Sequence, residues 1–243
     1  MTSGWVAELA LGGVVLLGST VQRMAGMGLA LVAVPVLALL IGPGEGVALA
    51  NCASGVISLL GLAGNWREVR PRAMVPLVLA AGGTVPAGVW VAERLPGPVL
   101  LVGIGLVVTL AVVVVLAGAR AAALRGTGGA VVAGAASGFM NSSAGVGGPA
   151  LSLYAVNAGW TVREFLPKAL FYGFVVNVFS VAAKGLPHLS RTGWSSAGAG
   201  IAAGAVIGAA LAGRVPEHWA RRAVLGIALA GGLSTLTKGA VGL

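Results

Sequence analysis

The sequence predicts an all-α polytopic membrane protein whose roughly ten hydrophobic segments form two inverted five-segment repeats, with interrupted helices at the membrane midplane. The first observation is composition: 58% of the 243 residues are hydrophobic, 9% are charged, and the mean hydropathy is +0.99. A water-soluble domain has about 25% charged residues, so this composition indicates a protein embedded in lipid. The other two observations are apolar runs separated by short charged loops and a weak internal repeat.

Runs of apolar residues bounded by charge, proline or glycine give ten segments. A helix needs about 20 residues to cross a bilayer, and the second, sixth and seventh runs are shorter than that. Two pairs, the first with the second and the sixth with the seventh, can either cross the membrane or re-enter it as hairpins, and the sequence leaves both open. The segments lie at about 4–22, 26–42, 45–64, 71–93, 97–118, 127–142, 145–158, 164–184, 193–213 and 219–240.

Positive charges in the loops predict the orientation in the membrane. Eleven Lys and Arg residues lie in loops that follow odd-numbered segments, and four lie on the opposite side. Cytoplasmic loops are enriched in Lys and Arg, so we expect both termini outside, Arg70 and Arg125 in the cytoplasm, and Lys184 and Arg191 outside. The eleven are Arg23, Arg67, Arg70, Arg72, Arg120, Arg125, Arg163, Lys168, Arg214, Arg221 and Arg222, and the four are Arg94, Lys184, Arg191 and Lys238.

Short motifs recur in the same order in both halves of the chain. The sequence AGMG at 25–28 matches AGVG at 144–147 with an offset of 119 residues, and GVWVAERLP at 88–96 matches GAALAGRVP at 208–216 with an offset of 120. Each half has an odd number of segments, so the second half should be inverted in the membrane, as in many transporters. The expected repeats and their short cytoplasmic linker are 1–118, 127–243 and 119–126.

The repeat aligns QRMAGMGLA at 22–30 with NSSAGVGGP at 141–149, and both stretches have polar side chains directly before a glycine cluster. Irregular backbone persists inside a membrane only where it faces protein or a water-filled cavity. Glycine permits a positive φ, which we expect at Gly145 and Gly147. The helix that follows each break presents free N–H groups and a positive dipole end, which attract anions. Two breaks, one per repeat, are therefore expected to meet near the midplane and hold a negatively charged solute.

The helix after the second break should begin near Gly145, with Pro149 in its first turn, where proline is tolerated. The alternative is that the glycines serve only close helix packing, with the hydroxyls of Ser142 and Ser143 bonded back to their own helix.

Two further segments have a polar stripe along one helix face, at spacing i, i+3, i+7 within 51–58 and i, i+4, i+7, i+11 within 173–184. The 119-residue offset places Ser58 on Asn177. These side chains either contact the solute or form hydrogen bonds between helices. The predicted substrate-binding residues are Gln22, Arg23, Gly26, Gly28, Asn51, Ser54, Ser58, Asn141, Ser142, Ser143, Gly145, Gly147, Gly148 and Asn177.

Arg23 is the only charged residue among these candidates. A guanidinium in the membrane interior costs at least about 2.5 kcal/mol, and its planar fork of donors suits an oxyanion. We therefore expect Arg23 to contact the solute or line its path, while an interfacial position, with the long side chain reaching water, is the alternative.

Enzymes and nucleic-acid-binding proteins do not fit this composition. Cys52 is the only cysteine, and the two histidines, His188 and His218, fall in loops, so the sequence predicts no metal, no cofactor and no catalytic site. Glu45 and Glu164, each opening a segment, either stabilise a helix N-terminus or relay protons. A channel remains a rival to a carrier, and the absence of a GxxxxGK[ST] motif argues against ATP as the direct energy source.

The chain resembles the TauE/SafE sulfite exporter family over nearly its whole length. The resemblance lies in the AGVGGP motif, its weaker AGMG copy, the segment REFLPKALFYGFVVNVFS and the G…G…R.P hairpin. It implies a bacterial inner-membrane carrier that exports sulfite, sulfoacetate or a related organosulfonate. Met27 and Leu29 depart from the expected glycine-rich run of the first copy. The expected partners are a small anionic solute and the lipid bilayer, with a homodimer left open and no nucleic acid.

Overall fold

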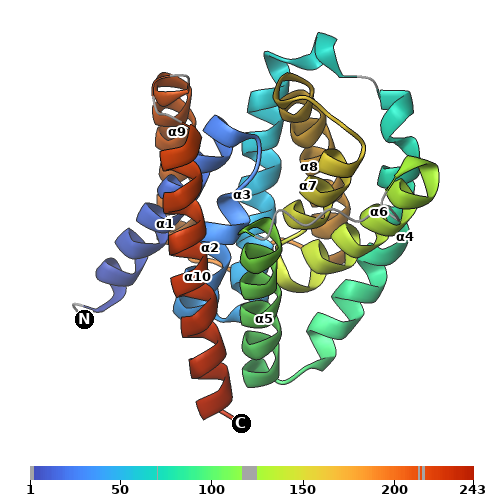
Figure 1. Ribbon diagram of the computed structural model, residues 1–243. Helices are drawn as coiled ribbons and strands as arrows, with labels where there is room; N and C mark the ends of the chain where they lie inside the picture. The colour runs from blue at the N-terminus through green and yellow to red at the C-terminus, as the bar shows by residue number, and fades with distance from the viewer. Residues whose placement is uncertain (1–2, 70, 117–124, 213, 215–216) are drawn as a thin grey trace.

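The computed structural model (Figure 1) describes residues 3–69, 71–116, 125–212, 214 and 217–243. All of the regular secondary structure in these ranges is helical, and the helices follow the ten expected segments in order, with one 3₁₀ turn, η1 (Trp66–Glu68). Arg70, Arg120 and residues 119–124 of the expected linker lie outside the described residues, as do the side chains of His218, Arg221 and Arg222. The helices are α1 (Ser3–Ala25), α2 (Leu29–Ile41), α3 (Pro43–Ala63), α4 (Pro71–Arg94), α5 (Gly97–Leu116), α6 (Gly126–Ala144), α7 (Gly148–Asn157), α8 (Val162–Lys184), α9 (Arg191–Leu211) and α10 (Glu217–Val241).

Local sequence explains where several of these helices begin. Pro43 occupies the first turn of α3, where its missing N–H is not needed. Helix α8 begins with a capping box: the Glu164 N–H donates to the Thr161 hydroxyl at 3.3 Å, and the Thr161 N–H donates to the Glu164 carboxylate at 3.1 Å. The Ser190 hydroxyl caps α9 by accepting from the Gly193 N–H at 2.9 Å.

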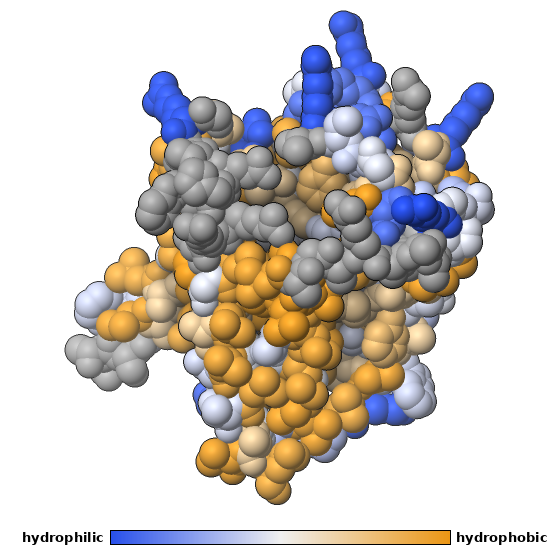
Figure 2. Space-filling view, in the orientation of Figure 1, coloured by the Kyte–Doolittle hydropathy of each residue, from blue (hydrophilic) through white to orange (hydrophobic). Residues whose placement is uncertain are grey.

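Seven of the described helices, α1, α3, α4, α5, α8, α9 and α10, are long and apolar enough to cross a membrane. The three that do not qualify, α2, α6 and α7, correspond to the runs that the sequence marks as short. Large apolar side chains such as Leu79, Leu110 and Val206 are exposed, and Figure 2 shows a broad hydrophobic surface below a hydrophilic rim. A surface of this kind is stable against lipid and not against water, so the protein is a multi-pass membrane protein.

Glycines allow the long helices to approach each other closely. A Cβ at Gly208 of α9 would lie 2.7 Å from the carbonyl oxygen of Thr20 in α1, and one at Gly88 of α4 would lie 2.6 Å from the carbonyl oxygen of Phe139 in α6. Helices α1 and α9 therefore pack side by side, as do α4 and α6, while α5 packs on α10 and α3 packs on α8. Such contacts between small residues are typical of helices in lipid.

The charged loops lie at opposite ends of the molecule. The turns between α3 and α4 and between α7 and α8 meet at the upper end of Figure 1, where Glu68 and Arg163 share a surface cleft. At the other end, Glu45 in the first turn of α3 accepts a hydrogen bond from the His188 N–H at 2.7 Å. Glu8 of α1 lies at this end too, because it accepts from the Ser190 hydroxyl at 3.1 Å.

Candidate functional site

Two helices are interrupted at the aligned glycine stretches. Helix α1 ends before Gly26 and α6 ends before Gly145, and both glycines have a positive φ, 77° and 72°. The N–H of Gly26 donates to the Gln22 carbonyl at 2.8 Å, and the N–H of Gly145 donates to the Asn141 carbonyl at 2.9 Å. Both interruptions that the sequence predicts are therefore present, and they begin with the same backbone turn.

The details of the second interruption differ from the expectation. Helix α7 begins at Gly148, three residues after Gly145, and Pro149 does lie in its first turn. Gly147 has a φ of −85°, so the positive φ expected there is wrong. The left-handed turn is completed by Gly145 alone, and Gly147 instead permits a close approach, because a Cβ there would lie 2.7 Å from the Ser137 carbonyl oxygen.

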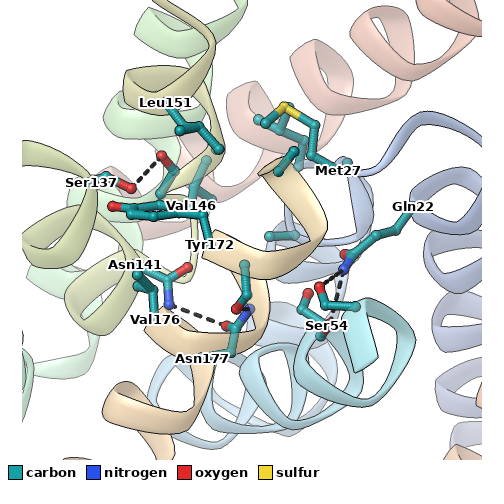
Figure 3. Close-up of a pocket in the computed structure, with 18 of the residues that line it drawn as sticks. Gln22, Met27, Ser54, Ser137, Asn141, Val146, Leu151, Tyr172, Val176 and Asn177 are labelled. Atoms are coloured by element: carbon teal, nitrogen blue, oxygen red, sulfur yellow. Dashed lines mark hydrogen bonds between the residues drawn. The ribbon is translucent and has the colours of Figure 1, made fainter. Parts of the chain in front are cut away.

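Both interruptions line one pocket between α3, α6 and α8 (Figure 3). The volume of this pocket is about 60 Å³. Met27 of the first interruption contacts the helix that follows the second: its sulfur accepts from the Ser152 hydroxyl of α7 at 3.1 Å. The lining residues are Gln22, Gly26, Met27, Gly28, Ala30, Leu31, Ser54, Ser58, Ser137, Asn141, Gly145, Val146, Gly147, Gly148, Pro149, Leu151, Ala169, Tyr172, Gly173, Val176 and Asn177.

Two amide side chains connect the interrupted helices to the long helices. The Gln22 amide of α1 donates to the Ser54 carbonyl and the Ser58 hydroxyl of α3, each at 2.9 Å. The Asn141 amide of α6 donates to the side-chain oxygen of Asn177 at 3.2 Å and to the Ser180 hydroxyl at 3.0 Å, and both acceptors are in α8. Figure 3 shows the bonds of Gln22 and the Asn141–Asn177 bond. Because these side chains are buried, their hydrogen bonds fix the position of each interruption relative to the long helix that it contacts.

Ten of the fourteen predicted site residues line this pocket, and Arg23, Asn51, Ser142 and Ser143 do not. Arg23 follows Gln22 by one residue, so helical geometry turns it about 100° away, and its Cβ faces Gly208 of α9. The structure therefore places Arg23 outside the pocket lining and against α9, and contact with the solute stays a prediction.

The other three residues outside the lining bond to nearby backbone. The hydroxyls of Ser142 and Ser143 donate to carbonyls one turn earlier in α6, at 3.0 and 2.7 Å. This is the back-bonding that the packing alternative predicts for these two serines. The Asn51 amide donates to the backbone carbonyl of Asn141 at 3.3 Å, so it connects α3 to α6 from outside the pocket lining.

The sequence-based prediction missed several lining residues, above all Tyr172 and Ser137. Tyr172 directly precedes Gly173 of the polar stripe, and Ser137 lies one helical turn before Asn141. The same helical spacing that identified the stripe therefore identifies Ser137, once the face of α6 is known. Tyr172 lacked such a signal, because an aromatic residue in an apolar helix is equally compatible with the core or with lipid.

The polar groups of the pocket are neutral. No described residue in its lining has a charged side chain. The donors are amides, hydroxyls and the backbone N–H groups of the first turns of α2 and α7, which have no partner within their own helices. Among the described residues, no group of three or more His, Cys, Asp or Glu side chains could hold a metal ion. The site is suited to a small solute that accepts several hydrogen bonds.

Long apolar helices around a pocket at two helix interruptions define a multi-pass membrane protein. The sequence matches the family described as Sulfite exporter TauE/SafE over residues 11–235, so the chain belongs to this family. Searches of curated proteins and of solved structures gave no match. The resemblance expected from the glycine motifs is confirmed, and the family is one of transporters of the sulfite-exporter type.

Proposed function

We propose that the protein is a secondary transporter that exports a small sulfur-containing oxyanion, such as sulfite or an organosulfonate, and binds it between the two helix interruptions. The observation that supports this most directly is that residues from both interruptions, 119 residues apart in sequence, line one pocket that also contains buried amide and hydroxyl side chains. The first turns of α2 and α7 belong to this lining, and a helix N-terminus binds anions through its free N–H groups and its dipole.

The size of the pocket fits a compact oxyanion. One water molecule needs about 10–15 Å³ of cavity volume, so the 60 Å³ of this pocket accommodates about four to six of them. Sulfite, with its four non-hydrogen atoms, is small enough for a space of this size. A longer sulfonate requires the pocket to widen.

Pairs of contacts related by the 119- or 120-residue offset support the proposal of an inverted repeat. The bond from Gln22 to Ser58 corresponds to the bond from Asn141 to Asn177. The close approach of Gly208 to α1 corresponds in the same way to the approach of Gly88 to α6. Helices α2 and α7 also begin 119 residues apart, at Leu29 and Gly148, as do α3 and α8.

The same repeat suggests how the solute crosses the membrane. Helices α3 and α8 come from different halves and touch beside the pocket, where a Cβ at Gly173 would lie 3.0 Å from the Ser58 hydroxyl. Small residues at this contact let one half rock against the other, which opens the pocket to each side in turn, as in other inverted-repeat carriers.

The proposed orientation places both termini on the outer side of the inner membrane. Glu8 of α1 lies at the same end as Glu45 and His188. The turns before α4 and α8, with Arg67 and Arg163 beside them, lie at the opposite end, where the positive-inside rule places the cytoplasm. With Cys52 replaced, a membrane-impermeant thiol reagent applied to intact cells should label a single cysteine at position 191 and not one at position 72. The reverse pattern would invert the proposed orientation.

Binding and counterflow test the function. Sulfite should raise the unfolding temperature of the purified protein, because a ligand that binds only the folded state stabilises it by RT ln(1 + [L]/Kd). Acetate at equal ionic strength is the control, and a larger shift with acetate favours a carboxylate carrier. In proteoliposomes, unlabelled sulfite inside should drive accumulation of radiolabelled sulfite, which a channel cannot do. The proposal would be refuted if neither sulfite nor small sulfonates raised the unfolding temperature and the protein transported none of them.

A further inference from the structure

Two serines of α3 line the pocket one helical turn apart, and their hydroxyls have different surroundings (Figure 3). Ser58 is fully buried, and its hydroxyl accepts from the Gln22 amide at 2.9 Å. Ser54 keeps 5% of its surface exposed, and the same Gln22 amide bonds only to its backbone carbonyl. Among the described residues, no hydrogen bond involves the Ser54 hydroxyl. Ser58 therefore links two helices, which is one of the two roles that the sequence allows, and the side chain of Ser54 does not.

The Ser54 hydroxyl also makes no bond to its own helix. Other hydroxyls in these helices do so: Thr20 donates to the Leu16 carbonyl at 2.9 Å, and Ser234 donates to the Ala230 carbonyl at 2.8 Å. A buried hydroxyl without a partner destabilises a protein, and such a group at a pocket is commonly explained by a bound ligand, ion or water molecule. Because Ser54 lies in the pocket lining and is not fully enclosed, a bound solute can supply the missing partner.

The part of α3 around Ser54 is bonded to both interruptions. The Ser54 carbonyl accepts from Gln22, just before the first interruption. Three residues earlier, Asn51 donates to the Asn141 carbonyl, just before the second. At the 119-residue offset Ser54 corresponds to Gly173, which also lines the pocket and has no side chain. The first half therefore supplies a hydroxyl at a position where the second half leaves space for the solute.

We propose that Ser54 contacts the transported solute directly, with its hydroxyl donating a hydrogen bond to an oxygen of the bound oxyanion. This inference rests on the proposed function and assigns a specific side-chain donor within that site. Hydrogen bonds to a charged oxygen are shorter and stronger than those between neutral groups. A solute that accepts no hydrogen bond leaves the hydroxyl unpaired, so Ser54 favours oxyanions over such solutes.

Ser19 of α1 provides a matched control. It is fully buried, and within the described part of the chain its hydroxyl has no hydrogen-bond partner either. It lies outside the pocket lining and faces Gly204 of α9. Ser54→Ala and Ser19→Ala therefore remove the same atom from two buried helical serines, one inside the site and one outside it.

Sulfite is titrated against the purified full-length protein and these two variants, with the unfolding temperature as the readout. We expect Ser54→Ala to raise the Kd for sulfite by about 10- to 100-fold, as for the loss of a hydrogen bond to a charged group, and Ser19→Ala to leave it unchanged. Without sulfite, Ser54→Ala should unfold at the wild-type temperature or above it, because alanine favours a helix more than serine does. A purely structural role predicts the opposite: a lower unfolding temperature without sulfite and an unchanged Kd.

A second pair of variants keeps the test decisive if alanine disturbs the packing of α3. Threonine and valine have nearly the same shape and differ by a hydroxyl in place of a methyl group, so Ser54→Thr should bind sulfite about 10- to 100-fold more tightly than Ser54→Val. Equal affinities of these two variants, a wild-type Kd for Ser54→Ala, or an equal loss in Ser19→Ala would overturn the inference and leave the proposed function intact. A wild-type protein that binds neither sulfite nor a small sulfonate would overturn both.

Discussion

The interruption between α1 and α2 and the one between α6 and α7 begin alike and then diverge. Gly26 and Gly145 make the same left-handed turn, with φ of 77° and 72°. Two residues later, Gly28 has a φ of 129° and Gly147 one of −85°. The initial turn is thus common to both interruptions, since a glycine with positive φ is a frequent way to end a helix, whereas the path into the next helix depends on what packs there.

The side chains before the two turns differ in length and in partner. Gln22 reaches α3, and Asn141 reaches α8, so each interruption is bonded to a long helix of its own half. The next position differs in charge, with Arg23 in the first half and Ser142 in the second, yet both residues face the glycine of a neighbouring helix. The first turn of the two interruptions is therefore more alike in backbone geometry than in the chemistry of its side chains.

Valine at the shared turn should have the largest effect. Gly145→Val forces a β-branched residue to a positive φ and brings its Cβ to 2.7 Å from the fully buried Val34 side chain. Gly26→Val has the same backbone strain, but its Cβ meets the flexible end of Leu166. We expect Gly145→Val to abolish sulfite binding and counterflow while the protein still inserts, and Gly26→Val to retain measurable binding. Equal activities for the two variants would show that the turns are not distinguished by their surroundings.

Alanine at the second glycine compares a strained position with one crowded by backbone. Gly28→Ala places a side chain at a φ of 129°, a strained conformation that costs about 1–3 kcal/mol, and its Cβ would lie 2.8 Å from the Val21 Cγ1, the end of a side chain. Its main effect should be a lower unfolding temperature. Gly147→Ala has an allowed φ, but its Cβ would lie 2.7 Å from the Ser137 carbonyl oxygen and 2.9 Å from the Asn141 Cβ. We expect it to weaken sulfite binding more than Gly28→Ala does, as measured by titration. If Gly28→Ala weakened sulfite binding more than Gly147→Ala, the backbone around Gly147 would have to accommodate the added methyl group without harm to the site.

The two amide connections should be similar and modest in strength. A hydrogen bond between membrane helices contributes about 0.6 kcal/mol in double-mutant cycles. A cycle of Gln22→Leu with Ser58→Ala should therefore give a coupling free energy of about 0.6 kcal/mol, and the cycle of Asn141→Leu with Asn177→Leu a similar value. Unfolding in mixed micelles measures both. A coupling of zero in one half only would show that the corresponding bond does not fix its interruption.

Arg23 should have the smallest effect on binding. It faces Gly208 and lies outside the pocket lining, so Arg23→Gln and Arg23→Lys should change the Kd for sulfite by no more than about twofold. Ser142→Ala, at the equivalent place in the second half, is the matched control. If both Arg23 variants weakened binding tenfold or more, the sequence-based expectation of contact with the solute would stand and the geometry around Gly208 would have to change during transport.

The sequence by itself determined the membrane class, the ten helices and the two interruptions. Apolar runs must become helices in lipid, since every backbone group needs a partner there, and a polar and glycine-rich stretch within such a run must break it. Ten of the fourteen predicted site residues follow from this logic, because they lie at the breaks or on the adjoining polar stripes.

Only the tertiary structure decided which helix faces meet. Residues that are neighbours in sequence point about 100° apart on a helix, so Gln22 lines the pocket while Arg23 packs against α9. The negative φ of Gly147 likewise follows from the approach of α6, which no local pattern encodes. Tyr172 joins the pocket lining for the same reason: which face of α8 lies toward the interruptions depends on residues from several helices, and the sequence of one helix does not contain them.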